Sequence, residues 1–93
     1  ILLLSIQDLA RINEAFNRND ISKLINIKTI HLSPTDILVT AKVDIKDECE
    51  VQSPEIINDI ERTIRAAFPN YKIYIYIETD NYQEDYDSAH PTR

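Results

Sequence analysis

The stretch from Ile37 to Ile45 restricts the possible folds of this chain more than any other segment. Apolar and polar side chains alternate along it, and its odd-numbered residues form one apolar face. Because successive side chains of a β-strand point to opposite sides, this pattern predicts a strand with one buried face. A second apolar run, from about Leu24 to Leu32, precedes it. The residues between them, Ser33 to Asp36, include Pro34 and favour a turn, so we predict a central β-hairpin.

Segments with helical periodicity lie on both sides of this hairpin. The first begins at Ser5, a favoured N-cap residue, and we expect it to end near Asn19. The second is expected to follow Ser53 as its N-cap and to end at Pro69. The chain contains no glycine, so we expect asparagine to supply any left-handed backbone position.

A third strand is predicted from Tyr71 to Thr79, where apolar residues alternate again. The first strand is less regular, because its apolar residues change parity between Ile27 and Ile30. We expect a β-bulge near Lys28-Thr29 to bring all of them to one face.

The resulting order, α-β-β-α-β, predicts an α+β fold of the two-layer ferredoxin-like (metallochaperone-like) type. Its three-stranded sheet, antiparallel or mixed, would carry two helices on one face. The other face, with Tyr74 and Tyr76, would stay open. We assign residues 1–79 to this domain. Residues 80–93 are acidic and without periodicity, and we expect them to be disordered.

Composition excludes several classes of function. The net charge of −6 argues against nucleic acid as a partner, although most of it lies at the C-terminal end. Residues 1–77 carry nine Lys/Arg against eleven Asp/Glu, whereas residues 78–93 carry one against five. The absence of glycine excludes Gly-rich phosphate loops, and no apolar run has the roughly 18 residues of a membrane span. No catalytic constellation is present, so an enzyme is not expected.

Four segments together resemble the cytoplasmic C-terminal domain of cation diffusion facilitator (cation efflux) transporters. They are LLLS at the start, IKTIHLSPTDILVTAKVDI, PEIINDIERTIRAAFP and IYIYIETD. The resemblance covers roughly residues 2–80, and the family usually has glycine where Ser33 stands. The first residue is not Met, which fits our expectation that the chain is a piece of a longer protein.

The resemblance implies a homodimeric regulatory domain joined to an upstream transmembrane domain of the same chain. It would lie at the cytoplasmic face of a membrane. The whole protein would export a divalent cation of the zinc, iron, cobalt or manganese class, coupled to protons. An alternative is a free-standing ferredoxin-like module that binds a small ligand or a metal.

The resemblance also implies where a metal site would lie in this domain. Family members with well-formed sites have histidines at positions that match Lys28, Ala41 and Tyr76, followed by an acid that matches Glu78. Three of these residue types cannot complete the four-donor set that zinc requires. We therefore expect metal binding by the domain, for example of zinc, to be weak or lost.

Other residues carry weaker indications of a site. The metal candidates are Glu78, His31 and Asp80, and a turn or packing role is the alternative for His31. Cys49 lies among acidic residues but is the only cysteine of the chain, so it has no second thiol with which to bind a metal. Tyr74 and Tyr76 suit either a protein interface or a solvated strand face. The acidic tail offers hard oxygen ligands and one imidazole, at an entropic cost of ordering; its candidates are Asp85, Asp87 and His90.

Overall fold

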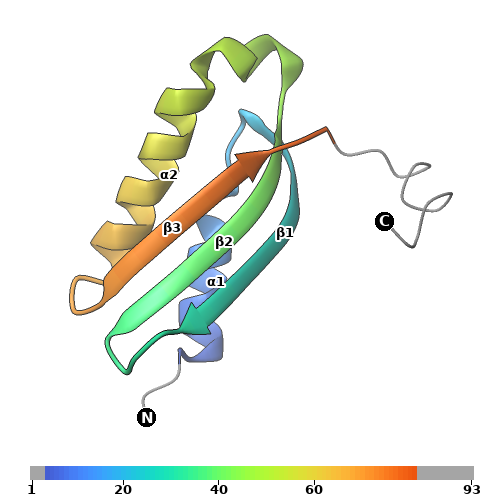
Figure 1. Ribbon diagram of the computed structural model, residues 1–93. Coiled ribbons are helices and arrows are strands. Elements are labelled where there is room, and N and C mark those ends of the chain that lie inside the picture. The colour runs from blue at the N-terminus through green and yellow to red at the C-terminus, as the bar shows by residue number, and fades with distance from the viewer. Residues whose placement is uncertain (1–3, 82–93) are drawn as a thin grey trace, which may run out of the picture.

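The computed structural model describes residues 4–81, and their architecture is the predicted two-layer α+β sandwich. The elements are α1 (Ile6–Glu14), β1 (Ile21–His31), β2 (Asp36–Ile45), the 3-10 helix η1 (Asp47–Gln52), α2 (Ser53–Ala67) and β3 (Lys72–Thr79). The central strand β2 is antiparallel to β1 and parallel to β3. Both long helices lie on one face of this mixed sheet (Figure 1). The predicted ferredoxin-like fold is thereby confirmed.

The core lies between the helices and the odd-numbered face of β2. Along β2, burial alternates without interruption, as the sequence predicted. Val39 and Val43 are fully buried, and Ile60 of α2 is fully buried as well. Apolar burial on this scale, worth roughly 1.5–3 kcal/mol for each large side chain, holds the two layers together.

Strand β1 reaches the core through two irregularities near its start, and the predicted bulge at Lys28-Thr29 is wrong. The register shifts lie between Ile21 and Lys23 and between Leu24 and Asn26. Each shift adds one residue to β1 without an added residue in β2. Apolar residues three apart on β1 therefore pair with core residues two apart on β2. The pairs are Ile21 with Ile45, Leu24 with Val43 and Ile27 with Ala41.

From Ile27 to His31 the pairing of β1 with β2 is regular. Ile30 therefore stays on the sheet face opposite the helices, where 48% of it is exposed. The prediction had moved this residue into the core, because it assumed that every apolar residue of the strand is buried.

The ends of the helices follow the predictions in part. Ser5 and Asp8 form the expected capping box at α1, with Asp8 N–H donating to Ser5 Oγ over 3.0 Å. α1 ends at Glu14, earlier than Asn19, because the next residues form 3-10-type turns, in which each N–H donates to the carbonyl three residues before it. Ser53 is the first residue of α2 and not its N-cap, because η1 runs directly into the helix and Ser53 already has helical dihedrals.

The described part of the chain needs no left-handed position for an asparagine to supply. No residue from 4 to 81 has a positive φ. The chain changes direction with 3-10 turns and with the hairpin turn at Ser33. There, Ser33 Oγ accepts a hydrogen bond from Asp36 N–H over 3.0 Å, and Leu32 N–H donates to the Asp36 carbonyl over 2.8 Å. This confirms the predicted hairpin.

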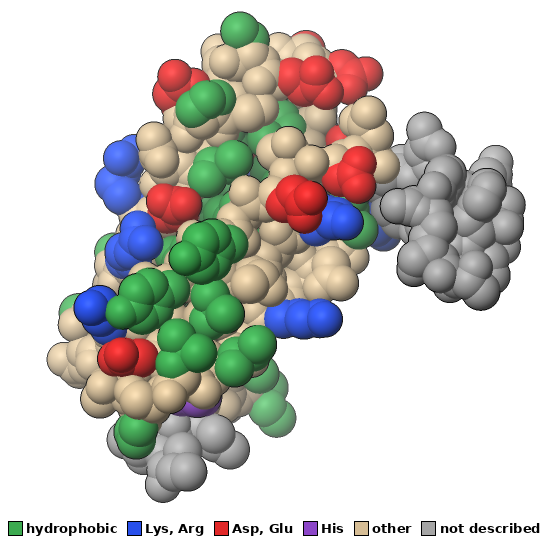
Figure 2. Space-filling view, in the orientation of Figure 1, with side chains coloured by type: hydrophobic (Ala, Val, Ile, Leu, Met, Phe, Trp, Pro, Cys, Tyr) green, Lys and Arg blue, Asp and Glu red, His purple; other side chains and the backbone are tan. Residues whose placement is uncertain are grey.

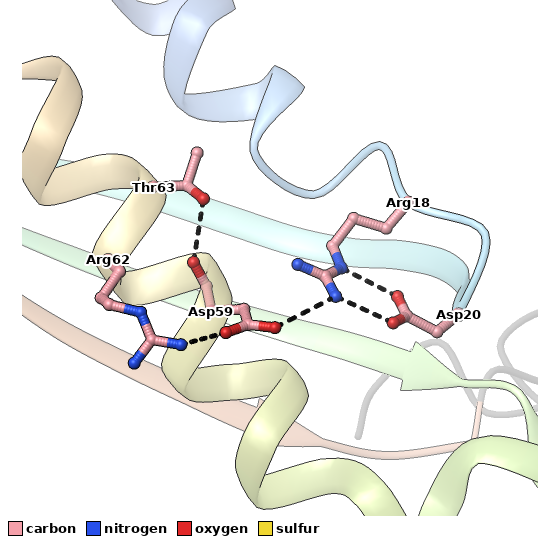
Figure 3. Close-up of polar contacts among 5 residues, drawn as sticks. All are labelled: Arg18, Asp20, Asp59, Arg62 and Thr63. Carbon is pink, nitrogen blue, oxygen red and sulfur yellow. Dashed lines mark hydrogen bonds and ion pairs between the residues drawn. The ribbon is translucent and has the colours of Figure 1, made fainter.

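A charged network ties the connection between α1 and β1 to α2 (Figure 3). Arg18 donates two hydrogen bonds to the Asp20 carboxylate, over 2.9 and 3.0 Å. Its guanidinium also lies 3.7 Å from Asp59, which is in turn paired with Arg62. The hydrogen bond from Arg18 lowers the pKa of Asp20, and the same bond raises the pKa of Arg18. Because both guanidinium N–H groups bind the same carboxylate, the relative orientation of the two side chains is better defined than in an ordinary surface ion pair.

No helix within residues 4–81 has the length and apolar character needed to cross a membrane. The predicted disorder of the acidic tail falls mostly on residues 82–93, which lie outside the described residues. Asp80 is still described, and its N–H donates to the Val43 carbonyl over 2.9 Å. The boundary at residue 79 remains a prediction.

Candidate functional site

The face of the sheet opposite the helices, here called the open face, carries exposed side chains of three strands. The strand register arranges them in rows across the sheet. The rows are Ile30–Leu38–Tyr74, then Lys28–Thr40–Tyr76, then Asn26–Lys42–Glu78. The open face therefore changes from apolar near the hairpin turn to charged near the other end.

The apolar half of the open face, here called the apolar patch, consists of Ile30, Leu38, Tyr74 and Tyr76. Leu38 and Tyr74 are half-buried, whereas Tyr76 is 66% exposed. Figure 2 shows apolar side chains gathered on this face towards the hairpin end. The Lys72 ammonium lies 5.3 Å from the centre of the Tyr74 ring, at the edge of the patch. Contiguous apolar groups with a charged rim are typical of protein interfaces.

The charged half contains the acid that the sequence placed at a metal site. Glu78 lies on the open face and is exposed. Lys28 and Lys42 line the same shallow hollow of about 250 Å³ as Glu78. Lys42 Nζ lies 3.8 Å from the Asp80 carboxylate. Glu78 and Asp80 therefore lie near lysine side chains, whose positive charge disfavours a divalent cation at the same place.

His31 lies on the other side of the sheet, in register with the buried Ile37. Its Nδ1 is 3.3 Å from the Ser33 carbonyl, and its Nε2 is buried without a hydrogen-bond partner. The ring packs edge-on against Tyr71, with 6.5 Å between ring centres. The structure thus places His31 in a packing position at the turn and does not bring it near Glu78 or Asp80.

Ala41 is also separated from the other positions that the family resemblance selected. It is buried on the helix-covered face, whereas Lys28, Tyr76 and Glu78 lie on the open face. The β2 residue between Lys28 and Tyr76 is Thr40. Ala41 therefore cannot share a site on the open face with the other three positions.

The remaining candidates do not form a cluster in the described residues. Cys49 lies in η1, half-buried against the core. Asp44, Glu50 and Asp80 line a hollow of about 310 Å³ at the end of the sheet. Within residues 4–81, no three His, Cys, Asp or Glu side chains are placed to hold a metal ion. Asp85, Asp87 and His90 lie outside the described residues.

Sequence reasoning placed Leu38, Tyr74 and Tyr76 on the open face but missed Ile30. The signal for Ile30 was its parity opposite to that of Ile27, because residues of opposite parity lie on opposite faces of a regular strand. It was misread because a bulge near Lys28 offered a simple way to bury an isoleucine.

Comparison with known families gives one match that covers most of the chain. Residues 5–80 match the family model ZT_dimer, described as the cytoplasmic domain of cation efflux proteins. Comparison with curated proteins gives no match.

Solved structures of MamM CTD have the same fold as this chain. A nickel form has 15% identity and a TM-score of 0.68, and the match covers 85% of this chain and 100% of that one. A cadmium form has 16% identity and a TM-score of 0.67, with 84% and 98% covered. A manganese form has 18% identity and a TM-score of 0.65, with 82% and 96% covered. At these identities the likeness shows a shared fold.

Proposed function

The chain belongs to the cation efflux protein family, as its cytoplasmic domain, and from that membership we propose that it is the dimerising, regulatory domain of a divalent-cation exporter. The transport step, coupled to protons, takes place in a transmembrane domain of the same protein. This domain lies at the cytoplasmic face of the membrane and acts by association, without catalysis. The metal forms in which MamM CTD variants have been solved support divalent cations as the cargo class.

The observation that carries this proposal is the apolar patch on the open face. Three strands contribute to it, and none of the helices covers it. Ile30, Leu38 and Tyr74 form one continuous row across the three strands, and contiguous exposed apolar surface of this kind marks interaction sites. The name of the family model points to a dimer, and a second copy supplies a matching apolar surface through two-fold symmetry.

Face-to-face packing of two sheets suits this surface. Sheets pack about 10 Å apart with side chains of both faces interdigitating. Leu38 and Tyr74 stand in one row and form the centre of such a contact. Lys72 and Asp36 lie one row nearer the turn and form a polar rim.

The domain binds divalent metal weakly in this proposal. A zinc site requires about four N, S or O donors. The open face offers the carboxylates of Glu78 and Asp80 and the hydroxyl of Thr40, but two lysine ammonium groups lie in the same region. His31 would have to leave its packed position behind the sheet to join them. The dimer therefore forms without a metal, and cation sensing belongs to another part of the transporter.

Two measurements on the 93-residue chain test this function. Sedimentation equilibrium is expected to give the mass of a dimer at high micromolar concentration, with no change after treatment with a chelator. Calorimetric titration with zinc is expected to show only weak binding. A monomer at all concentrations would contradict the dimerising role. Tight, stoichiometric binding would contradict the weak site and would direct attention back to Glu78, His31 and Asp80.

A further inference from the structure

Two charged side chains on the open face, Lys28 and Glu78, form no ion pair within the described protomer, although Lys42 lies beside Glu78 in the strand register. Lys28 of β1 and Glu78 of β3 are both exposed, and neither forms an ion pair among residues 4–81. Lys42, which lies between them on β2, is already paired with Asp80. The open face thus presents Lys28 on one outer strand and Glu78 on the other, each without an ion-pair partner among residues 4–81.

The strand order makes these two charges complementary under two-fold symmetry. β2 is the middle strand, with β1 on one side and β3 on the other (Figure 1). A two-fold axis that runs along β2 between two facing sheets places β1 of one copy over β3 of the other. In that arrangement Lys28, in the row of Thr40 and Tyr76, lies over the partner's Tyr76.

The partner's Glu78 is then within reach of the same lysine. Glu78 is two residues beyond Tyr76 on the same face of β3, which corresponds to roughly 7 Å along the strand. An extended lysine side chain covers this offset, and its ammonium group can also rest on the tyrosine ring. By symmetry the contact occurs twice in each dimer.

We propose that two reciprocal ion pairs, Lys28 with the partner's Glu78, fix the orientation of the dimer without a metal ion. This inference rests on the proposed dimer and adds how it is regulated. The dimer responds to ionic strength and does not require a divalent cation. The pairs also offset the mutual repulsion of two chains that each carry a net charge of −6.

Charge reversal in separate copies tests the pairing between protomers. Lys28→Glu places two carboxylates against each other at both contacts of its homodimer, and Glu78→Lys places two ammonium groups there. Each variant alone is expected to raise the dissociation constant of the dimer by roughly tenfold or more, because facing like charges are strongly unfavourable. An equimolar mixture of the two variants is expected to restore association, because both contacts in the mixed dimer again join opposite charges.

The mixture distinguishes this inference from its alternatives. Pairing within one chain would leave the mixture as weak as its components, and that result would overturn the proposal. The control Arg65→Glu makes the same change in charge as Lys28→Glu on the helix layer and is expected to leave the dissociation constant unchanged. If it weakens the dimer equally, net charge is responsible and the specific pair is refuted.

The dependence of dimerisation on ionic strength provides a second readout on the unmodified chain. Raising the ionic strength is expected to weaken its dimer more than that of the double variant Lys28→Ala/Glu78→Ala, because screening acts on the charge pair. Equal salt dependence of the two would contradict the inference. A monomeric unmodified chain would refute the dimerising function itself, whereas a dimer that ignores all charge changes would refute only the ion pairs.

Discussion

Ile30→Thr separates the contribution of the apolar patch to association from its contribution to folding. Threonine keeps the branched β-carbon that suits a strand, but it replaces apolar surface with a hydroxyl group. Ile30 is 48% exposed in the protomer, so a second copy can bury about half of its side chain. The substitution therefore acts mainly on the dimer.

The expected magnitude follows from this exposure. Burying a whole isoleucine side chain is worth roughly 1.5–3 kcal/mol, so covering the exposed half contributes about 1 kcal/mol in each copy. A symmetric dimer loses this twice, or about 2 kcal/mol, which corresponds to a roughly 30-fold higher dissociation constant. Loss of the cross-strand contact with Leu38 costs the monomer about 0.2–1 kcal/mol.

Sedimentation equilibrium measures the dissociation constant, and thermal unfolding of the dilute protein measures monomer stability. Val51→Thr is the matched control, because Val51 is 86% exposed and lies in η1, away from the open face. An unchanged dissociation constant for Ile30→Thr would refute the apolar patch as the dimer contact. Equal weakening by the control would show that the effect does not depend on the open face.

Two further predictions concern the fold. Ile60→Ala is expected to lower the free energy of unfolding by about 2–5 kcal/mol, because Ile60 is fully buried between helix and sheet; a loss below this range in urea denaturation would contradict the packing described. The Arg18–Asp20 pair is expected to stabilise the fold fully at pH values above 3.8, the ordinary pKa of aspartate. This contribution is lost as the pH falls through the lowered pKa of Asp20 in the folded protein. Acid unfolding of Asp20→Asn is expected to lack that part of the pH dependence, and identical acid transitions would contradict it.

The sequence by itself determined the elements and their order. Uninterrupted alternation in β2 can be satisfied only by a strand with one covered face, and the structure follows it residue by residue. The capping box at Ser5 and the turn at Ser33 depend on neighbouring residues only, so they too were predictable. The motifs of the chain were also enough to identify its family.

Only the tertiary structure decided which strand residues face which side. In β1, two bulges change the parity before Ile27, and a bulge depends on how the neighbouring strand is paired. The same register places Ala41 in the core and puts His31 and Glu78 on opposite faces and at different ends of the sheet. A sequence fixes the spacing of its residues along a strand, but the pairing of strands decides which of them meet on one surface.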